Sequence, residues 1–173
     1  MSTFKLRCEQ LEDRDTPAGN ITAVLSGSQL YLTGDAFDNA VSTQQDASGN
    51  IVVFGVNGTT INGQSSLFIG NGILRDLIIR TGDGNDLIDV AGLFVTNGIT
   101  VESGNGNDQT QFRNVTAQYI ASYSGSGSDA LMTSNVQVGV GFDFKGGDGT
   151  DYWQNRGITA GQWASVMEFE GFV

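Results

Sequence analysis

Apolar and polar residues alternate with a period of two along much of the chain, at fixed distances from a recurring glycine motif. The motif reads Gly-x-Gly-x-Asp, and it ends at Asp86, Asp108, Asp129 and Asp151, in steps of 22, 21 and 22 residues. Period-two alternation indicates a β-strand with one buried face. A repeat of this length is typical of a solenoid, in which each coil lies on the last.

Three alternating stretches and two corners fill each repeat. Before the motif, the residues expected to face inward are Leu77, Ile99, Ile120 and Phe142, then Ile79, Val101, Ser122 and Phe144. After the motif they are Ile88, Thr110, Leu131 and Trp153, then Val90, Phe112, Thr133 and Asn155. A second corner is expected at Gly92, Asn114, Asn135 and Gly157, because glycine and asparagine tolerate a left-handed backbone. The third inward stretch begins at Leu93, Val115, Val136 and Ile158.

This pattern predicts an all-β fold, a right-handed parallel β-helix of 21–22-residue, three-strand coils with an N-terminal β-hairpin cap. The right-handed form follows from the handedness of parallel crossovers. Residues 74–161 are expected to form the regular coils and 162–173 a C-terminal cap. Trp153 and Trp163 are expected to cover the core, and the alternative is that they form an interface for self-association. Within the cap and irregular coils at 19–73, Gly34 to Asp38 is interpreted as a decayed first copy of the motif and 59–73 as a degenerate coil.

The first 18 residues are polar and of mixed charge, which is consistent with a solvated tail. The run from Leu6 to Pro17, Leu-Arg-Cys-Glu-Gln-Leu-Glu-Asp-Arg-Asp-Thr-Pro, also resembles a leader found on many bacterial surface and exported proteins. The resemblance implies a secreted or cell-surface protein. Both interpretations of residues 1–18, leader or flexible tail, remain open.

Composition excludes several classes of function. A net charge of -11 argues against nucleic-acid binding, which needs clustered lysine and arginine. The chain has no histidine, so the Ser-His-Asp triad and ordinary zinc sites are absent. Cys8 is the single cysteine, and no apolar run is long enough to span a membrane.

The motif aspartates are the first candidate site. In stacked coils about 4.8 Å apart, Asp86, Asp108, Asp129 and Asp151 form a ladder of like charges, which costs about 1 kcal/mol per adjacent pair even in water. Calcium bound between coils would offset this repulsion, with Asp83 and Asp148 as auxiliary ligands. The alternative needs no metal: each carboxylate accepts hydrogen bonds from the amides of its own glycine turn.

The stretch Thr81-Gly82-Asp83-Gly84-Asn85-Asp86-Leu87-Ile88-Asp89 resembles the repeats of the RTX family of calcium-binding proteins. The resemblance implies a parallel β-roll with calcium at its turns. The chain departs from that pattern at the first glycine, which is replaced by Thr81, Ser103 and Ser124 and kept only as Gly146.

The outer face of the strand before the motif is the second candidate site. It carries polar and aromatic side chains that are suited to binding a sugar or an acid: Arg80, Glu102, Tyr123, Asp143 and Lys145. A solvated charge ladder would show the same residues. The sequence therefore predicts a non-catalytic secreted or cell-surface module with a structural, adhesive or binding role. The alternative is a module that binds or cleaves polysaccharide, and end-to-end self-association is a further expectation.

Overall fold

A computed structural model describes residues 18–172, in which every regular element is a β-strand. The strands before the regular coils are β1 (Asn20–Ser26), β2 (Gln29–Thr33), β3 (Ala40–Gln45), β4 (Asn50–Gly55), β5 (Thr60–Ile61) and β6 (Ser66–Asn71). The regular coils contain β7 (Leu74–Asp83), β8 (Leu87–Ala91), β9 (Val95–Asn105), β10 (Gln109–Arg113), β11 (Thr116–Gly127), β12 (Ala130–Gly149) and β13 (Tyr152–Ala160). The chain closes with β14 (Trp163–Met167) and β15 (Gly171–Phe172).

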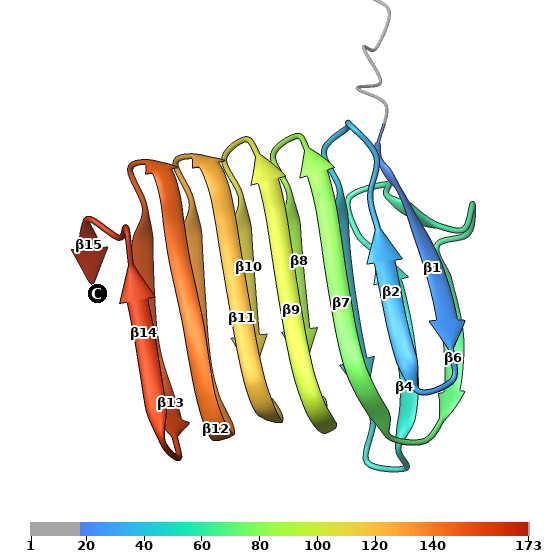
Figure 1. Ribbon diagram of the computed structural model, residues 1–173. Helices are drawn as coiled ribbons and strands as arrows, with labels where there is room; N and C mark the ends of the chain where they lie inside the picture. Colours follow the sequence, from blue (N-terminus) through green and yellow to red (C-terminus); the bar gives the residue numbers. More distant parts are fainter. Residues whose placement is uncertain (1–17, 173) are drawn as a thin grey trace, which may run out of the picture.

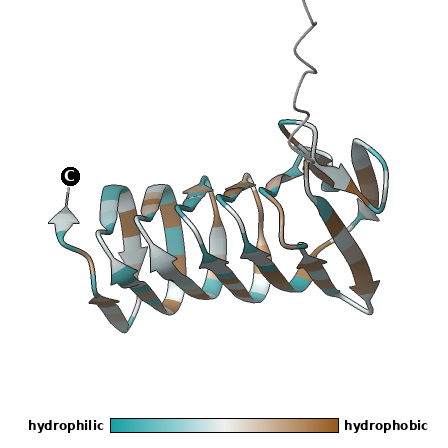
Figure 2. Cartoon of the chain, turned by 90° about the horizontal axis from the view of Figure 1, so that it is seen from above, coloured by the Kyte–Doolittle hydropathy of each residue, from teal (hydrophilic) through white to brown (hydrophobic). Residues whose placement is uncertain are grey.

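Two parallel sheets face each other across the core, which confirms the predicted β-solenoid (Figure 1). The front sheet contains β2, β7, β9, β11, the second half of β12, and β14. The rear sheet contains β3, β8, β10, the first half of β12, and β13. In the view of Figure 1 each front strand runs up, the chain then turns back at the glycine motif, and the rear strand runs down. Each coil lies nearer the C-terminal end than the coil before it, so the solenoid is right-handed. Seen from above, the coils stand in a single row (Figure 2).

The predicted columns fill the space between the sheets. Pairing places like positions opposite one another, for example Ile79 beside Val101 and Val101 beside Ser122. The C-terminal half of the core is aromatic: the rings of Phe112 and Phe144 lie parallel with centroids 6.2 Å apart, and Trp153 meets Phe144 edge-on at 5.7 Å. The third stretch of each coil is short and runs on into the next front strand, so that β12 passes through a complete coil.

The corners explain the placement of glycine. In the motif turn, Gly82 and Gly104 have φ angles of 102° and 108°, and a Cβ at Gly104 would lie 1.9 Å from the carbonyl oxygen of Gly82. Successive turns therefore stack backbone against backbone, at a distance that only glycine permits. At the second corner Asn114 and Asn135 are left-handed, as predicted, with φ angles of 54° and 51°.

The N-terminal cap differs from prediction in two respects. Its first coil, formed by β2 and β3, is displaced by one residue, because Ala40 pairs with Leu87 and Asn39 therefore occupies the place of the aspartate. Residues 59–73 do not form a degenerate coil. They contain β5 and β6, and β6 pairs antiparallel with β4, which in turn pairs antiparallel with β3. The β1–β2 hairpin of the expected cap is present.

The C-terminal end adds β14 to the front sheet and β15 to the rear sheet. Trp153 is buried as expected, but Trp163 is not: 45% of its surface is exposed on the outer face of the front sheet. The expectation that Trp163 covers the core is therefore wrong. The leader-like segment Leu6–Pro17 lies outside the described residues. Among those residues, no helix of membrane-spanning length and hydrophobicity occurs.

Candidate functional site

Hydrogen bonds join the motif aspartates of successive coils into one column. The backbone N–H of Asp86 donates to Oδ1 of Asp108 at 2.8 Å, and the N–H of Asp108 donates to Oδ1 of Asp129 at 2.7 Å. The same bond joins Asp129 to Asp151 at 2.8 Å. Each carboxylate therefore binds the turn of the preceding coil and not its own turn, so the metal-free alternative had named the wrong amide donor.

The second oxygen of these carboxylates has a different environment. In all four aspartates Oδ2 is buried and accepts no hydrogen bond. The nearby hydroxyls of Thr81 and Ser103 donate to the carbonyl oxygens of Ser103 and Ser124 in the next coil, each at 2.9 Å. These two bonds account for Thr81 and Ser103, two of the three residues that replace the first motif glycine.

Burial raises the pKa of every carboxyl group in the column. For Asp108 burial is the largest cause, and it outweighs the Asp86 N–H and the nearby Ser103 hydroxyl, which both lower the pKa. The charges of Asp86 and Asp129 add to the effect of burial, and the pKa rises from 3.8 to about 6. Burial is also the largest cause of the raised pKa of Asp86, Asp129 and Asp151. The column is thus a row of buried acids in which a proton is held more tightly than in water.

Different residues close the two ends of the column. At the N-terminal end, the N–H of Asn39 donates to Oδ1 of Asp86 at 2.8 Å, so that a neutral side chain stands in the aspartate position. At the C-terminal end, Glu170 accepts the N–H of Asp151 at 2.6 Å. The column therefore continues through the irregular coils, although neither end residue belongs to a Gly-x-Gly-x-Asp motif.

The predicted auxiliary metal ligands lie apart from this column. Asp83 is exposed and accepts a hydrogen bond from the Asn105 amide at 2.7 Å, and Asp148 is also exposed. Across residues 18–172, no three acidic side chains gather closely enough to hold a metal ion. Oδ1 of each buried carboxylate accepts a backbone N–H of the preceding coil.

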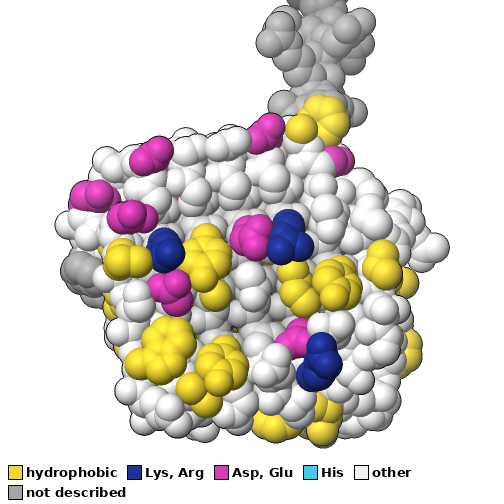
Figure 3. Space-filling view, viewed as in Figure 1, with side chains coloured by type: hydrophobic (Ala, Val, Ile, Leu, Met, Phe, Trp, Pro, Cys, Tyr) yellow, Lys and Arg dark blue, Asp and Glu magenta, His cyan; other side chains and the backbone are white. Residues whose placement is uncertain are grey.

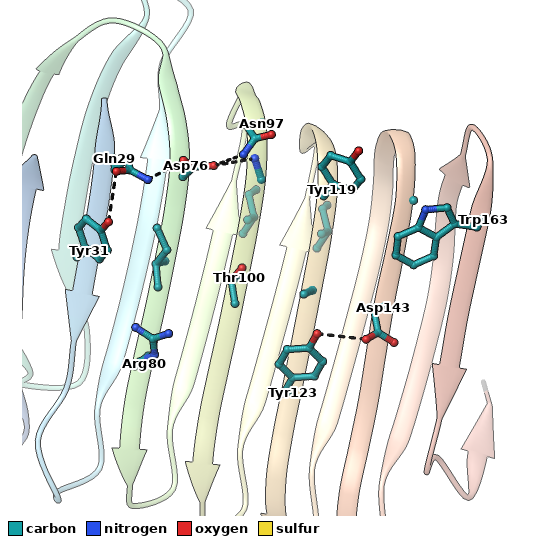
Figure 4. Close-up of a pocket in the computed structure, with 16 residues that line it drawn as sticks. Gln29, Tyr31, Asp76, Arg80, Asn97, Thr100, Tyr119, Tyr123, Asp143 and Trp163 are labelled. Carbon is teal, nitrogen blue, oxygen red and sulfur yellow. Dashed lines mark hydrogen bonds between the residues drawn. The ribbon is translucent and has the colours of Figure 1, made fainter. Parts of the chain in front are cut away.

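The second candidate site is a groove of about 510 Å³ on the outer face of the front sheet. Its floor is low because small side chains, Thr100 and Ala121, stand at the centre of the sheet beside Gly98. Aromatic rings line it, with Tyr31 at one end and Trp163 at the other, and charged side chains of opposite sign lie together on this face (Figure 3). Figure 4 shows how the lining side chains project from successive strands.

One wall of the groove is made of paired charges. Arg80 binds Glu102 through two hydrogen bonds of 2.9 and 3.0 Å, and this pair lowers the pKa of the Glu102 carboxyl. The Tyr123 hydroxyl donates to Oδ2 of Asp143 at 3.2 Å, and Lys145 lies 3.8 Å from the same oxygen. The Lys145 ammonium group also lies over the Tyr123 ring, 5.2 Å from its centroid.

A hydrogen-bond network around Asp76 forms the opposite wall (Figure 4). Oδ2 of Asp76 accepts bonds from Gln29 and Arg75, both at 2.8 Å, and Oδ1 accepts bonds from Asn97 at 2.6 Å and the Gly98 N–H at 3.3 Å. Burial alone would raise the pKa of this carboxyl, but the donors outweigh burial and lower it. The network fixes the amide groups of Gln29 and Asn97 at the rim.

Three of the predicted outer-face residues line the groove: Arg80, Tyr123 and Asp143. Glu102 and Lys145 lie beside it and pair with them. Sequence reasoning missed the column six residues before the first motif glycine, which contains Asp76, Gly98, Tyr119 and Gly141. Continuing the period-two alternation by one more step toward the N-terminus would have found it. Trp163 was missed because its coil lacks the motif.

No family model, no curated protein and no solved structure matches the chain. The fold and the geometry of its two sites are therefore the basis for the function.

Proposed function

We propose that this protein is a non-catalytic carbohydrate-binding module that holds a polysaccharide in the groove of its front sheet. The observation that carries the proposal is the combination of a low floor with aromatic side chains at Tyr31, Tyr119, Tyr123 and Trp163. Aromatic rings offer flat apolar faces to the C–H faces of sugar rings, and amide groups beside them exchange hydrogen bonds with hydroxyls. Tyr119 and Trp163 are 44% and 45% exposed, so both rings are accessible.

The length of the groove favours a polymer over a single sugar. It extends from Tyr31 on β2 to Trp163 on β14, and the path crosses five strand-to-strand steps. At about 4.8 Å per step the lining spans about 24 Å, which is several sugar rings. Because successive strands are parallel and in register, the groove runs straight along the solenoid axis and is long enough to follow an extended polymer.

Two acids on this face, Asp76 and Glu102, are poor candidates for a general acid, which supports a binding role over cleavage. A general acid must keep its proton near neutral pH, which requires a raised pKa. Hydrogen bonds and ion pairs lower the pKa of Asp76 and Glu102. Tyr123 has a raised pKa, caused first by burial and then by Asp143, so its hydroxyl stays neutral as a hydrogen-bonding group.

We also propose that the module acts outside the cell or at its surface, where polysaccharides are the abundant partners. The support is the sequence from Leu6 to Pro17, which resembles the leader of many bacterial surface and exported proteins. Fractionation of the producing cells tests the location. Recovery of the full chain only in the cytosol would contradict it.

The binding proposal is tested by titrating the purified chain with a panel of soluble polysaccharides in affinity gels and by calorimetry. We expect at least one to bind, and we expect Trp163→Ala and Tyr119→Ala each to weaken binding about tenfold. Tyr152→Ala is the matched control, because Tyr152 is 49% exposed on the rear sheet, outside the groove. Failure of every polymer to bind would contradict the proposal, and release of reducing ends would show that the protein is an enzyme.

A further inference from the structure

We infer that Gly98 is a specificity-determining residue of this groove and that the polysaccharide it admits is uncharged. The inference rests on the proposed function and deepens it. One sugar ring of the polymer lies over Gly98, between the Asp76–Asn97 pair and Tyr119.

Neither the backbone nor the packing requires glycine at position 98. Its φ angle lies outside the left-handed range, and an added Cβ would meet no atom closer than 3.8 Å. Glycine weakens the interior of a strand, and where no bulge geometry demands it, it marks a place where another molecule approaches the backbone closely. The pairing irregularity between Leu74 and Asp76 adjoins Gly98, but it does not give Gly98 the positive φ of a glycine bulge.

The other glycine in the same outer column has a reason to be there. Gly141 pairs with Trp163, and a Cβ at Gly141 would lie 2.4 Å from the indole ring, so this glycine lets the tryptophan lie flat on the sheet. Between them the column alternates large and small: Asp76, Gly98, Tyr119, Gly141 and Trp163. The space above Gly141 is filled by Trp163, whereas no side chain covers Gly98.

The sides of the hollow above Gly98 offer the contacts that a sugar ring uses. Asp76 holds the Asn97 side-chain amide nitrogen at 2.6 Å, and the Asn97 amide oxygen makes no hydrogen bond to any described residue. That oxygen is an acceptor for a hydroxyl. Across the hollow, Tyr119 offers an exposed ring. One edge of the sugar thus meets a fixed polar group while its face meets an aromatic ring.

The charges on this face point to an uncharged polymer. Each cation is already paired with an acid: Arg75 with Asp76, Arg80 with Glu102, and Lys145 with Asp143. A uronate or sulfate group would have to break one of these pairs, and would approach a protein of net charge -11. Hydroxyl groups face neither cost.

The test compares Gly98→Val with Gly72→Val in binding a neutral β-glucan and a polyuronate of similar length. Gly72 is the matched control, because an added Cβ there meets no atom within 4 Å and it lies in the cap, away from the groove. We expect Gly98→Val to weaken glucan binding at least tenfold with an unchanged melting temperature, Gly72→Val to bind as wild type does, and the polyuronate to bind at least tenfold more weakly than the glucan. If Gly98→Val proves unstable, Gly98→Ala, whose Cβ has room, is expected to weaken binding about threefold.

If Gly98→Val binds the glucan as tightly as wild type does, the role of Gly98 is overturned, while the carbohydrate-binding function still stands. Polyuronate binding as tight as glucan binding would overturn the claim that the polymer is uncharged. If wild type binds no polymer of the panel, the proposed function fails, and this inference fails with it.

Discussion

The backbone N–H of Asp86 donates a 2.8 Å hydrogen bond to Oδ1 of Asp108, while Oδ2 of Asp108 is buried with no hydrogen-bond partner. Oδ1 therefore has a hydrogen-bond donor, and Oδ2 has none among the described residues. A proton on Oδ2 would turn that oxygen into a donor, whereas the ionised oxygen is a buried acceptor that no donor in the described part of the chain reaches. None of the four salt bridges among residues 18–172 reaches the column to stabilise its charged form.

The free energy of unfolding is therefore expected to fall as the pH rises from about 4 to about 7. The pKa of Asp108 is raised from 3.8 to about 6 in the folded chain, so the folded state binds the proton more tightly than the unfolded state. The stabilising contribution is complete below pH 3.8 and is lost as the pH passes about 6. It amounts to at most about 3 kcal/mol for this residue. Urea unfolding at a series of pH values measures it, and stability that rises throughout this range would contradict the prediction.

The substitution Asp108→Asn separates this effect from the general repulsion of an acidic protein. Its amide oxygen still accepts the Asp86 N–H, and its neutral NH2 group places a donor at the position of Oδ2 without a charge at any pH. We expect the variant to be more stable than wild type at pH 7 by about 1–3 kcal/mol and to show a flatter dependence on pH. Asp83→Asn is the control, because it removes the same charge from an exposed position outside the column.

Calcium is expected to leave the melting temperature unchanged within about 1 °C. Oδ1 of the column aspartates binds backbone amides, and the side chains are at most 3% exposed. Hydrated calcium has no access to them without opening the turns. Thermal unfolding in EDTA and in millimolar calcium, with magnesium as the control ion, decides the question. A calcium-specific increase of several degrees would restore the calcium sites that the RTX-like motif suggests.

Glycine at the stacked turn is expected to be far more sensitive to substitution than glycine at an open turn. Gly104→Ala combines a φ angle of 108° with a Cβ 1.9 Å from the Gly82 oxygen, and it should destabilise the fold by about 3 kcal/mol or more. Gly27→Ala also requires a positive φ, of 59°, but meets no atom within 4 Å, and should cost about 1 kcal/mol. Equal losses in urea unfolding would show that strain, and not stacking, sets the requirement.

The regular coils could be predicted because each position is constrained twice, by its own strand and by the coils on either side. The column through Ile79 is buried as predicted, and so is the column through Val90 as far as Thr133, whereas Asn155, predicted to face inward in the last coil, is exposed. Residues 59–73 lack the motif, and their antiparallel pairing with β4 depends on contacts with distant strands that no local pattern records. The same reason explains Asn39, whose place in the aspartate column follows from the pairing of β3 with β8.

The groove could be predicted only in part, since the outer face of a strand carries no hydrophobic periodicity to mark it. Arg80, Tyr123 and Asp143 were found as polar residues between buried ones. The importance of Gly98 depends on the empty space above it, which a sequence does not show. The exposure of Trp163 likewise depends on Gly141, which leaves room for the indole on the outside of the sheet.

The hydrogen bonds of the aspartate column all point the same way, from the N–H of one coil to the carboxylate of the next. Removing or duplicating one whole coil therefore joins a donor to an acceptor again, whereas a partial coil leaves both unmatched. The hydrogen-bonded column thus tolerates the gain or loss of complete coils, each of which changes the length of the front sheet by about 4.8 Å. The number of coils therefore sets the length of the front sheet, and one added coil would lengthen the proposed polysaccharide groove by about 4.8 Å.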